Sequence, residues 1–158
     1  MLQTLLEDRF ALNFRREMRE GDALALMVDR PDGTLGPNVK PWNGTCVRGA
    51  PTETEEAATP RCLSGYRPGG ITLDGATMIS AAQLLGLPQS RRLLGGVSID
   101  KTGLTGRYTM ELEYMFPPPP DAPALSTVLK EQWGLKIVPI RETFLTIVVE
   151  SAQRPTMD

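Results

Sequence analysis

The sequence predicts an α+β fold in which three helix–hairpin units form a mostly antiparallel sheet, with the helices packed on one face. Two observations predict this class. Several short stretches alternate apolar and polar residues, as strands with one buried face do. Stretches with apolar residues at helical spacing precede such strands three times along the chain. With 158 residues, the chain is long enough for one core, and we expect a single domain over residues 1–158.

The first unit is predicted in residues 1–29. Residues 1–9 carry three leucines at helical spacing, which predicts a helix. Residues 10–18 alternate and predict a strand, and residues 23–29 predict a second strand that is apolar on both faces. The sequence Glu-Gly-Asp at 20–22 is typical of a turn, so the two strands are expected to form a hairpin.

Residues 31–75 are expected to form a long irregular loop. Proline and glycine are frequent in this range, and no helical or strand period persists, although a short strand is indicated at 71–73. Cys46 and Cys62 both lie here. A disulfide between them would close a loop of about 17 residues and contribute roughly 3 kcal/mol. Two free thiols in a reducing cytoplasm are the other interpretation, and the sequence leaves both open.

The second unit begins with a helix predicted at 76–87, for which Gly86 offers the C-terminal cap. Arg91 and Arg92 are expected on a short linker or half-turn. Residues 97–116 then read as strand, turn and strand. In the second of these strands Tyr108 and its alternate neighbours are expected to be buried, while Glu111 and its alternate neighbours face water.

The third unit follows a stiff, proline-rich connector at 117–123. Leu125, Val128 and Leu129 predict a helix, with Asp121 as its N-terminal cap and Gly134 at its end. Residues 135–140 and 143–150 are expected to form the last hairpin. The second of these strands is the most apolar run in the chain, which favours a central position in the sheet.

Composition removes several classes of function. The chain has no histidine, which excludes Ser-His-Asp and Cys-His nucleophilic sites and histidine-based zinc sites. The net charge of −2, with both signs mixed along the chain, argues against nucleic-acid binding. No run of about 18 apolar residues is present, so no membrane span is expected. As written, the chain opens without a signal peptide, which predicts a cytoplasmic location.

The turn from Asp100 to Arg107 is the first candidate site. Asp100, Lys101 and Arg107 bring a carboxylate and two cations together as candidate catalytic residues, and Thr102 and Thr105 add hydroxyls for ligand binding. A lysine or arginine there could stabilise developing negative charge. The structural interpretation is that Asp100 caps the turn through backbone N–H groups and that Arg107 pairs with a strand carboxylate.

Two further candidates are weighed in the same way. Glu111 and Glu113 lie two residues apart on the wet face of a strand, where they could hold Ca²⁺ or form an ordinary solvated face. Apart from Ca²⁺ no cofactor is expected. Trp42 sits in a glycine-rich loop, as a ligand-stacking residue or as a loop anchor.

Three blocks of sequence carry a family resemblance. They are M-L-Q-T-L-L-E-D-R-F at the start, I-D-K-T-G-L-T-G-R-Y from residue 99, and the segment from L-K-E-Q-W-G-L-K-I to T-I-V-V-E-S-A-Q-R-P-T. Together they resemble the C-terminal part of a large family of uncharacterised soil-bacterial proteins, defined by a domain of unknown function. The resemblance implies an exported or periplasmic family, whose members usually carry an export signal and a further half before the matching part.

Two functional hypotheses follow. The first is a non-catalytic binding or interaction module derived from an exported envelope protein. The second is a histidine-free hydrolase of a small ester or lactone, with or without Ca²⁺, in which a carboxylate activates water. Whether the protein is an enzyme is left open. The partner would be a protein or a small molecule, and an exposed sheet edge could also produce a homodimer.

Overall fold

The computed structural model describes residues 4–5, 9–44, 46 and 62–154. The chain divides into two compact units. We call Asp22–Ile140 the core unit, and Met1–Gly21 with Arg141–Asp158 the ribbon unit. Two long strands, β1 (Asn13–Val28) and β7 (Leu135–Ser151), contribute to both units. The single-domain organisation remains a prediction, and each unit is described by itself.

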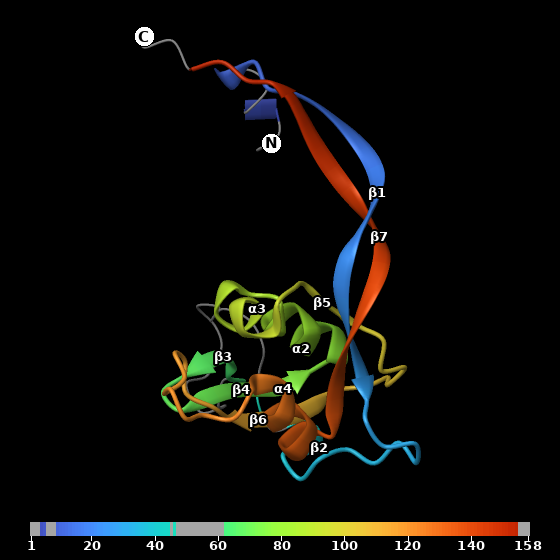
Figure 1. The fold of residues 1–158 in the computed structure, drawn as a ribbon, viewed down its shortest axis with the longest axis vertical. Helices are drawn as coiled ribbons and strands as arrows, with labels where there is room; N and C mark the ends of the chain where they lie inside the picture. Colours follow the sequence, from blue (N-terminus) through green and yellow to red (C-terminus); the bar gives the residue numbers. More distant parts are fainter. Residues whose placement is uncertain (1–3, 6–8, 45, 47–61, 155–158) are drawn as a thin grey trace. The chain divides into compact units, whose positions relative to one another are not determined.

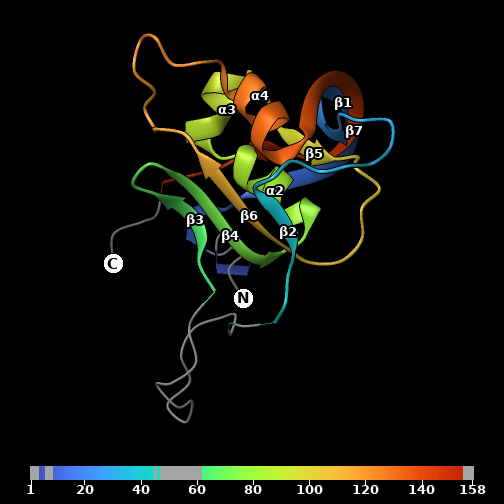
Figure 2. The same ribbon diagram turned by 90° about the horizontal axis from the view of Figure 1, so that it is seen from below.

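A four-stranded antiparallel sheet forms the frame of the core unit. Its order is β2-β6-β4-β3, as Figure 2 shows. The two central strands pair with Leu73 opposite Met110, which places apolar side chains from both on the same face. The bounds of the strands are Val39–Pro41 for β2, Ser64–Arg67 for β3, Gly70–Ala76 for β4 and Tyr108–Glu113 for β6.

The second sheet has the order β5-β1-β7. Within the core unit, β5 (Ser98–Asp100) pairs in parallel with Leu24–Leu26 of β1. This stretch of β1 is fully buried, and Leu26 belongs to the hydrophobic core.

Four helical segments lie in the described part of the core unit. In α2 (Met78–Leu85) the Thr77 side chain accepts a hydrogen bond from the Ser80 N–H, at 3.2 Å, and so caps the first turn. The others are α3 (Pro88–Leu94), α4 (Leu125–Val128) and a π-helical turn, η1 (Leu129–Trp133), which continues α4.

One hydrophobic core joins the sheet and the helices of this unit. Trp133 is fully buried, and its Nε1–H donates to the Glu111 carbonyl oxygen at 2.8 Å, which ties η1 to β6. Burying side chains of this kind is the dominant favourable term in folding. The largest fully buried apolar side chains are Leu26, Ile71, Met78, Leu85, Met110, Leu112, Leu125, Leu129, Trp133 and Leu135.

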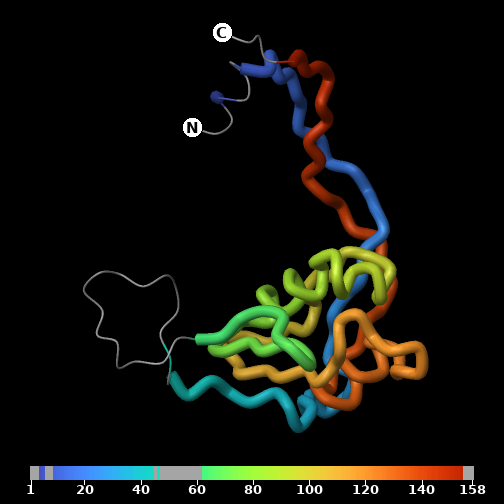
Figure 3. The backbone as a smooth tube through the Cα atoms, turned by 90° about the vertical axis from the view of Figure 1, so that its left-hand side faces the viewer, coloured from blue at the N-terminus to red at the C-terminus, as the bar shows by residue number. Residues whose placement is uncertain are grey.

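The strands of the ribbon unit are residues 13–21 of β1 and residues 141–151 of β7. The two strands are neighbours in the sheet and run side by side, as Figures 1 and 3 show. None of the side chains at 11–21 or 141–151 is buried. An ion pair between Arg15 Nε and Glu150 Oε1, at 3.2 Å, links the strands near one end.

The predicted fold class is wrong. The structure is a mixed α/β protein with short helices and two sheets, and its strands do not form three helix–hairpin units. The first and third predicted hairpins are each one continuous strand, β1 and β7. At the expected first turn, the Phe144 ring lies 3.4 Å from the position that a Cβ of Gly21 would take. Strand β7 therefore packs beside the point where a reversal was expected.

The middle hairpin is also absent, because its two strands belong to different sheets. β5 pairs with β1, whereas β6 pairs with β2 and β4. The local pattern of strand and turn was read correctly, but pairing is decided by contacts distant in sequence. The expected alternation in β6 is confirmed, since Met110, Leu112 and Tyr114 are buried while Glu111 and Glu113 are exposed.

Smaller predictions divide in the same way. The helix ending at Gly86 and the strand at 71–73 are confirmed by α2 and β4. Arg91 and Arg92 lie in helix α3 rather than on a linker, and Ala124 rather than Asp121 precedes α4. The irregular loop expected at 31–75 is wrong in part, because this range contains β2, β3 and most of β4, which ends at Ala76. Of the predicted helix at 1–9, residues 1–3 and 6–8 are outside the described residues.

No helix in the described residues is long and apolar enough to cross a membrane.

Candidate functional site

Asp100 organises the turn that was the first candidate site. Its Oδ1 accepts hydrogen bonds from the Thr102 N–H at 2.9 Å and from the Thr102 hydroxyl at 2.8 Å. The Thr102 hydroxyl oxygen in turn accepts from the Leu104 N–H at 3.1 Å. The expected cap is therefore confirmed, because one oxygen of this carboxylate holds the backbone of the turn.

The Arg107 side chain and the Lys101 backbone both donate to carbonyl oxygens elsewhere in the core unit. Arg107 Nη1 donates to the Gly75 carbonyl oxygen at 2.8 Å, so its partner is a β4 backbone group rather than the expected strand carboxylate. The backbone N–H of Lys101 donates to the Leu26 carbonyl oxygen at 2.9 Å and continues the pairing of β5 with β1. Thr105 is exposed, and its carbonyl oxygen accepts from the Tyr108 hydroxyl at 3.0 Å. These bonds fix the turn to the core unit.

Glu111 and Glu113 both present exposed side chains from β6. Their backbone groups are used by η1: Glu111 accepts from Trp133, and Glu113 exchanges two hydrogen bonds with the Gln132 amide, at 2.8 and 3.1 Å. No group of three or more metal-ligating side chains occurs among the residues the structure describes. A Ca²⁺ site at this pair stays a prediction.

Trp42 follows β2 and packs beside the turn. Its backbone N–H donates to the Arg107 carbonyl oxygen at 3.0 Å. Its ring lies 2.9 Å from the position that a Cβ on Gly75 would take. Gly75 has φ +58°, and the missing side chain leaves space for the indole. The indole Nε1 is buried and has no hydrogen-bond partner among the residues that the structure describes. The contacts are those of a loop anchor, and ligand stacking by Trp42 stays a prediction.

An open cavity of about 510 Å³ lies beside the end of β6. It is lined by Glu113, Tyr114 and Gln132 together with residues of the proline-rich connector and α4. The Tyr114 hydroxyl donates to the Pro123 carbonyl oxygen at 3.2 Å, and burial raises the pKa of this phenol. The polar atoms of Tyr114 and Gln132 at this cavity are therefore already used within the protein.

Cys46 and Cys62 form a disulfide, with their Cα atoms 5.0 Å apart. This resolves the two interpretations that the sequence left open. Disulfides form and persist in oxidising compartments, whereas cytosolic thiols are kept reduced.

The ribbon unit has two distinct faces. The Arg15–Glu150 ion pair places the odd-numbered residues of β1 on the same face as the even-numbered residues of β7. Correspondingly, Arg141 Nε lies 3.9 Å from Glu20 Oε2, which places the even-numbered residues of β1 with the odd-numbered residues of β7.

The second of these faces carries an apolar stripe. We define the stripe as Met18, Leu145, Ile147 and Val149, whose side chains are 64%, 64%, 61% and 57% exposed. Large apolar side chains this exposed and this contiguous are unusual on a protein surface without a partner. The sequence indicated that the strand at 143–150 would be central, and this prediction is wrong because β7 is the last strand of its sheet. The apolar run on both faces of the strand gave the signal, but none of its side chains is buried among the described residues.

Architecture and site together define a mixed α/β protein with an exposed β-ribbon, in which the candidate catalytic residues hold a turn. The chain belongs to the family described as protein of unknown function (DUF3738), whose model matches residues 1–152. No curated protein and no solved structure matches this chain.

Proposed function

We propose that this protein is a non-catalytic interaction module that works in an oxidising compartment, and that its binding surface is the ribbon unit. One observation carries the proposal: the apolar stripe is exposed on a ribbon of which no described side chain is buried. A partner that covers the stripe would remove this apolar surface from water, which is favourable by about 25 cal/mol per Å².

The architecture of the ribbon supports the same function. A two-stranded ribbon is marginally stable in water, and three or more strands with an apolar face are needed for independent stability. Among the described residues of the ribbon unit, β1 and β7 have only each other as sheet neighbours, because β5 pairs with β1 at Leu24–Leu26. A partner strand would supply the missing neighbour by β-augmentation.

The compartment is part of the proposal. The Cys46–Cys62 disulfide supports a location outside the reducing cytoplasm. It agrees with the exported soil-bacterial proteins that the sequence resembles, whose most recognisable motif corresponds to Asp100–Tyr108. The cytoplasmic location expected from the chain as written is the competing proposal, and non-reducing mass spectrometry of the protein from its natural cells tests it. Two free thiols there would support the cytoplasm.

The hydrolase hypothesis has less support. One oxygen of Asp100 already binds both polar groups of Thr102, and Arg107 already binds a backbone carbonyl, so their roles in the turn account for both side chains. Assays with small esters and lactones, with and without chelator, test this alternative. Turnover that is lost in an Asp100→Asn variant would contradict the non-catalytic proposal.

Site-specific photo-crosslinking tests the binding surface. A photoreactive amino acid replaces Leu145 in the stripe, and in a matched control it replaces Ile79, which is 58% exposed on α2 of the core unit. In the cells that make the protein, Leu145 is expected to give discrete adducts and Ile79 none. The absence of adducts at Leu145, or equal adducts at both positions, would overturn the proposal.

A further inference from the structure

We propose that one partner of the ribbon is a second copy of this chain, joined by antiparallel pairing of the two β1 strands about Met18. This inference rests on the proposed function: the second copy binds the β1 edge of the ribbon, and the apolar stripe stays available to the partner that photo-crosslinking at Leu145 would detect. The pairing would convert two ribbons into one four-stranded antiparallel sheet of order β7-β1-β1-β7. A two-fold axis would pass through the sheet at Met18.

The edge of β1 that faces away from β7 offers the pairing site. β7 occupies one edge of this strand, and β5 occupies the other only at Leu24–Leu26. In the described part of the chain, no strand pairs with this second edge over residues 13–21. Its backbone N–H and C=O groups therefore form a template for another strand. The edge is long enough for the seven residues from Arg15 to Gly21, centred on Met18, to pair with their copies.

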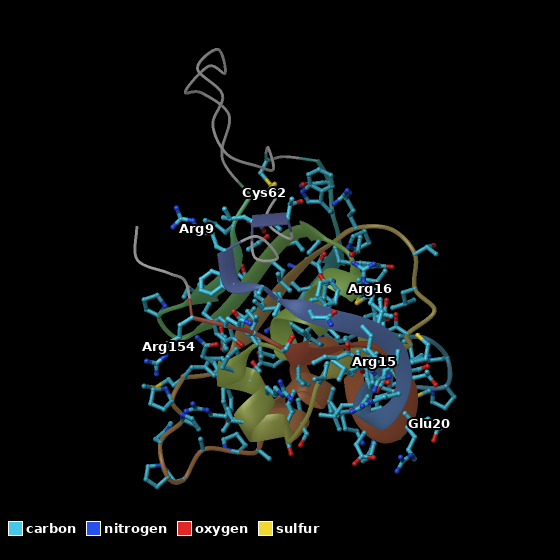
Figure 4. All side chains as sticks on the ribbon, turned by 90° about the horizontal axis from the view of Figure 1, so that it is seen from above. Arg9, Arg15, Arg16, Glu20, Cys62 and Arg154 are labelled. Carbon is cyan, nitrogen blue, oxygen red and sulfur yellow. A yellow bond between two sulfur atoms is a disulfide. The ribbon has the colours of Figure 1, made fainter. Side chains whose placement is uncertain are left out.

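The charge pattern R-R-E-M-R-E at residues 15–20 suits this register. In an antiparallel pair with Met18 opposite its own copy, two residues lie opposite each other when their numbers add to 36. Arg16 then lies opposite Glu20, and Glu17 lies opposite Arg19. Every charged residue from 16 to 20 thus meets an opposite charge across the strands, and the two-fold symmetry repeats each pair. Figure 4 labels Arg15, Arg16 and Glu20 along β1.

Charge also excludes the neighbouring registers. A two-fold axis perpendicular to the sheet allows only registers in which one residue lies opposite its own copy. If Glu17 occupied the axis, Arg15 would face Arg19 and two Glu17 side chains would meet. If Arg19 occupied the axis, two arginines would meet. The sequence therefore specifies one register, whereas charges that merely protect an edge from pairing would specify none.

The pairing also brings apolar side chains together. Met18 is 64% exposed, and the pairing places it against its copy on the face that carries the apolar stripe. Because the axis is perpendicular to the sheet, the stripes of both copies lie on the same face and form one wider apolar surface. Within each copy, Arg16 lies 5.7 Å from the centre of the Phe14 ring on this same face.

Charge reversal tests the register. Sedimentation velocity over a range of concentrations is expected to show reversible dimers of the natural chain. Glu17→Arg and Arg19→Glu should each weaken dimerisation roughly tenfold, since each places two pairs of like charges across the axis. The double variant Glu17→Arg/Arg19→Glu restores opposite charges and should dimerise like the natural chain. Dimerisation that the single variants leave unchanged, or that the double variant does not restore, would overturn the register.

Cysteine cross-linking tests the axis independently. A Met18→Cys variant places two thiols opposite each other, so mild oxidation should convert it to a covalent dimer. Leu145→Cys is the matched control, because Leu145 is equally exposed on the same face but lies on β7 away from the axis. Cross-linking at least tenfold faster at Met18 is expected, and equal rates would overturn the proposal.

The failure of this inference is distinguishable from the failure of the proposed function. A natural chain that stays monomeric at high concentration, together with discrete photo-adducts at Leu145 to another protein, would refute the second copy as the partner while the interaction module stands. Monomers without adducts would refute both.

Discussion

At the scale of single residues, Gly134 and Gly103 share a backbone conformation and differ in surroundings. Their φ values are +68° and +70°, in the left-handed region. A Cβ on Gly134 would lie 2.6 Å from the Gly36 backbone nitrogen and 2.9 Å from the Leu35 carbonyl carbon. A Cβ on Gly103 would meet no atom of the described residues within 4 Å. The sequence indicated Gly134 as a helix end, but the close approach of residues 35–36 is a contact across the fold that no local pattern reports.

Alanine substitutions at Gly134 and Gly103 separate the cost of backbone strain from the cost of steric overlap. Gly103→Ala should lower the free energy of unfolding by about 1 to 2 kcal/mol through the left-handed conformation alone. Gly134→Ala should cost about 2 kcal/mol more, since backbone atoms cannot rotate out of the way. Urea unfolding of both variants measures the difference, and equal losses would contradict the contact of η1 with residues 35–36.

Tyr114 gives a pH dependence. Burial raises the pKa of its phenol above the ordinary value of 10.0, so the folded state keeps its proton after the unfolded state has released it. Stability contributed by the neutral phenol is complete below about pH 10 and is lost as the pH rises toward the folded pKa. Tyr114→Phe should show a shallower loss of stability above pH 10, and about 1 kcal/mol lower stability at neutral pH because the hydrogen bond to Pro123 is absent.

Thermal unfolding between neutral pH and pH 11 measures this effect. Tyr108→Phe is the control, since it also removes a phenol that donates to a backbone carbonyl oxygen, that of Thr105. An unchanged alkaline slope in Tyr114→Phe would contradict the assignment.

At the scale of elements, strands and helices were predictable while their partners were not. The alternation in β6, the end of α2 at Gly86 and the helix stop at Gly134 follow from the period of 2 and from glycine chemistry, and all three are present. The three hairpins were inferred from proximity in sequence, which favours local pairing. In the fold, β1 instead lies between β5 and β7, and β6 between β2 and β4. Burial of non-local apolar surface decided these pairings.

The same distinction applies to the candidate site. The Asp100 cap was predictable because an aspartate bonds the backbone two residues on, which is a local interaction. The bond from Arg107 to Gly75 and the packing of Trp42 on Gly75 join segments more than thirty positions apart in the chain, so the sequence could not indicate them.

The disulfide connects two elements, since Cys46 follows β2 and Cys62 precedes β3. Replacing both cysteines by serine should lower the free energy of unfolding by about 3 kcal/mol, through the added conformational freedom of the unfolded chain. Guanidinium unfolding of the variant measures the loss. The natural chain under reducing conditions should behave like the variant, and a difference between the two would contradict the entropic explanation.

At the scale of the whole molecule, the core unit has a continuous hydrophobic core, whereas the ribbon unit has none among its described residues. The most apolar run of the chain lies in the ribbon unit, on the last strand of its sheet. A run of this kind normally becomes the centre of a sheet. In the proposed dimer the sheet has the order β7-β1-β1-β7, so β1 becomes central, while the apolar run of β7 stays at the edge and remains available to another partner.

Hydrogen exchange measured at low and high protein concentration tests this claim most directly. If two copies pair through β1, amide protons of residues 15–21 that point toward the free edge should exchange more slowly as the concentration rises, while those of β4 should not change. The Arg19→Glu variant should lose the concentration dependence. Exchange in residues 15–21 that is fast at every concentration would contradict the pairing of the ribbon with a second copy.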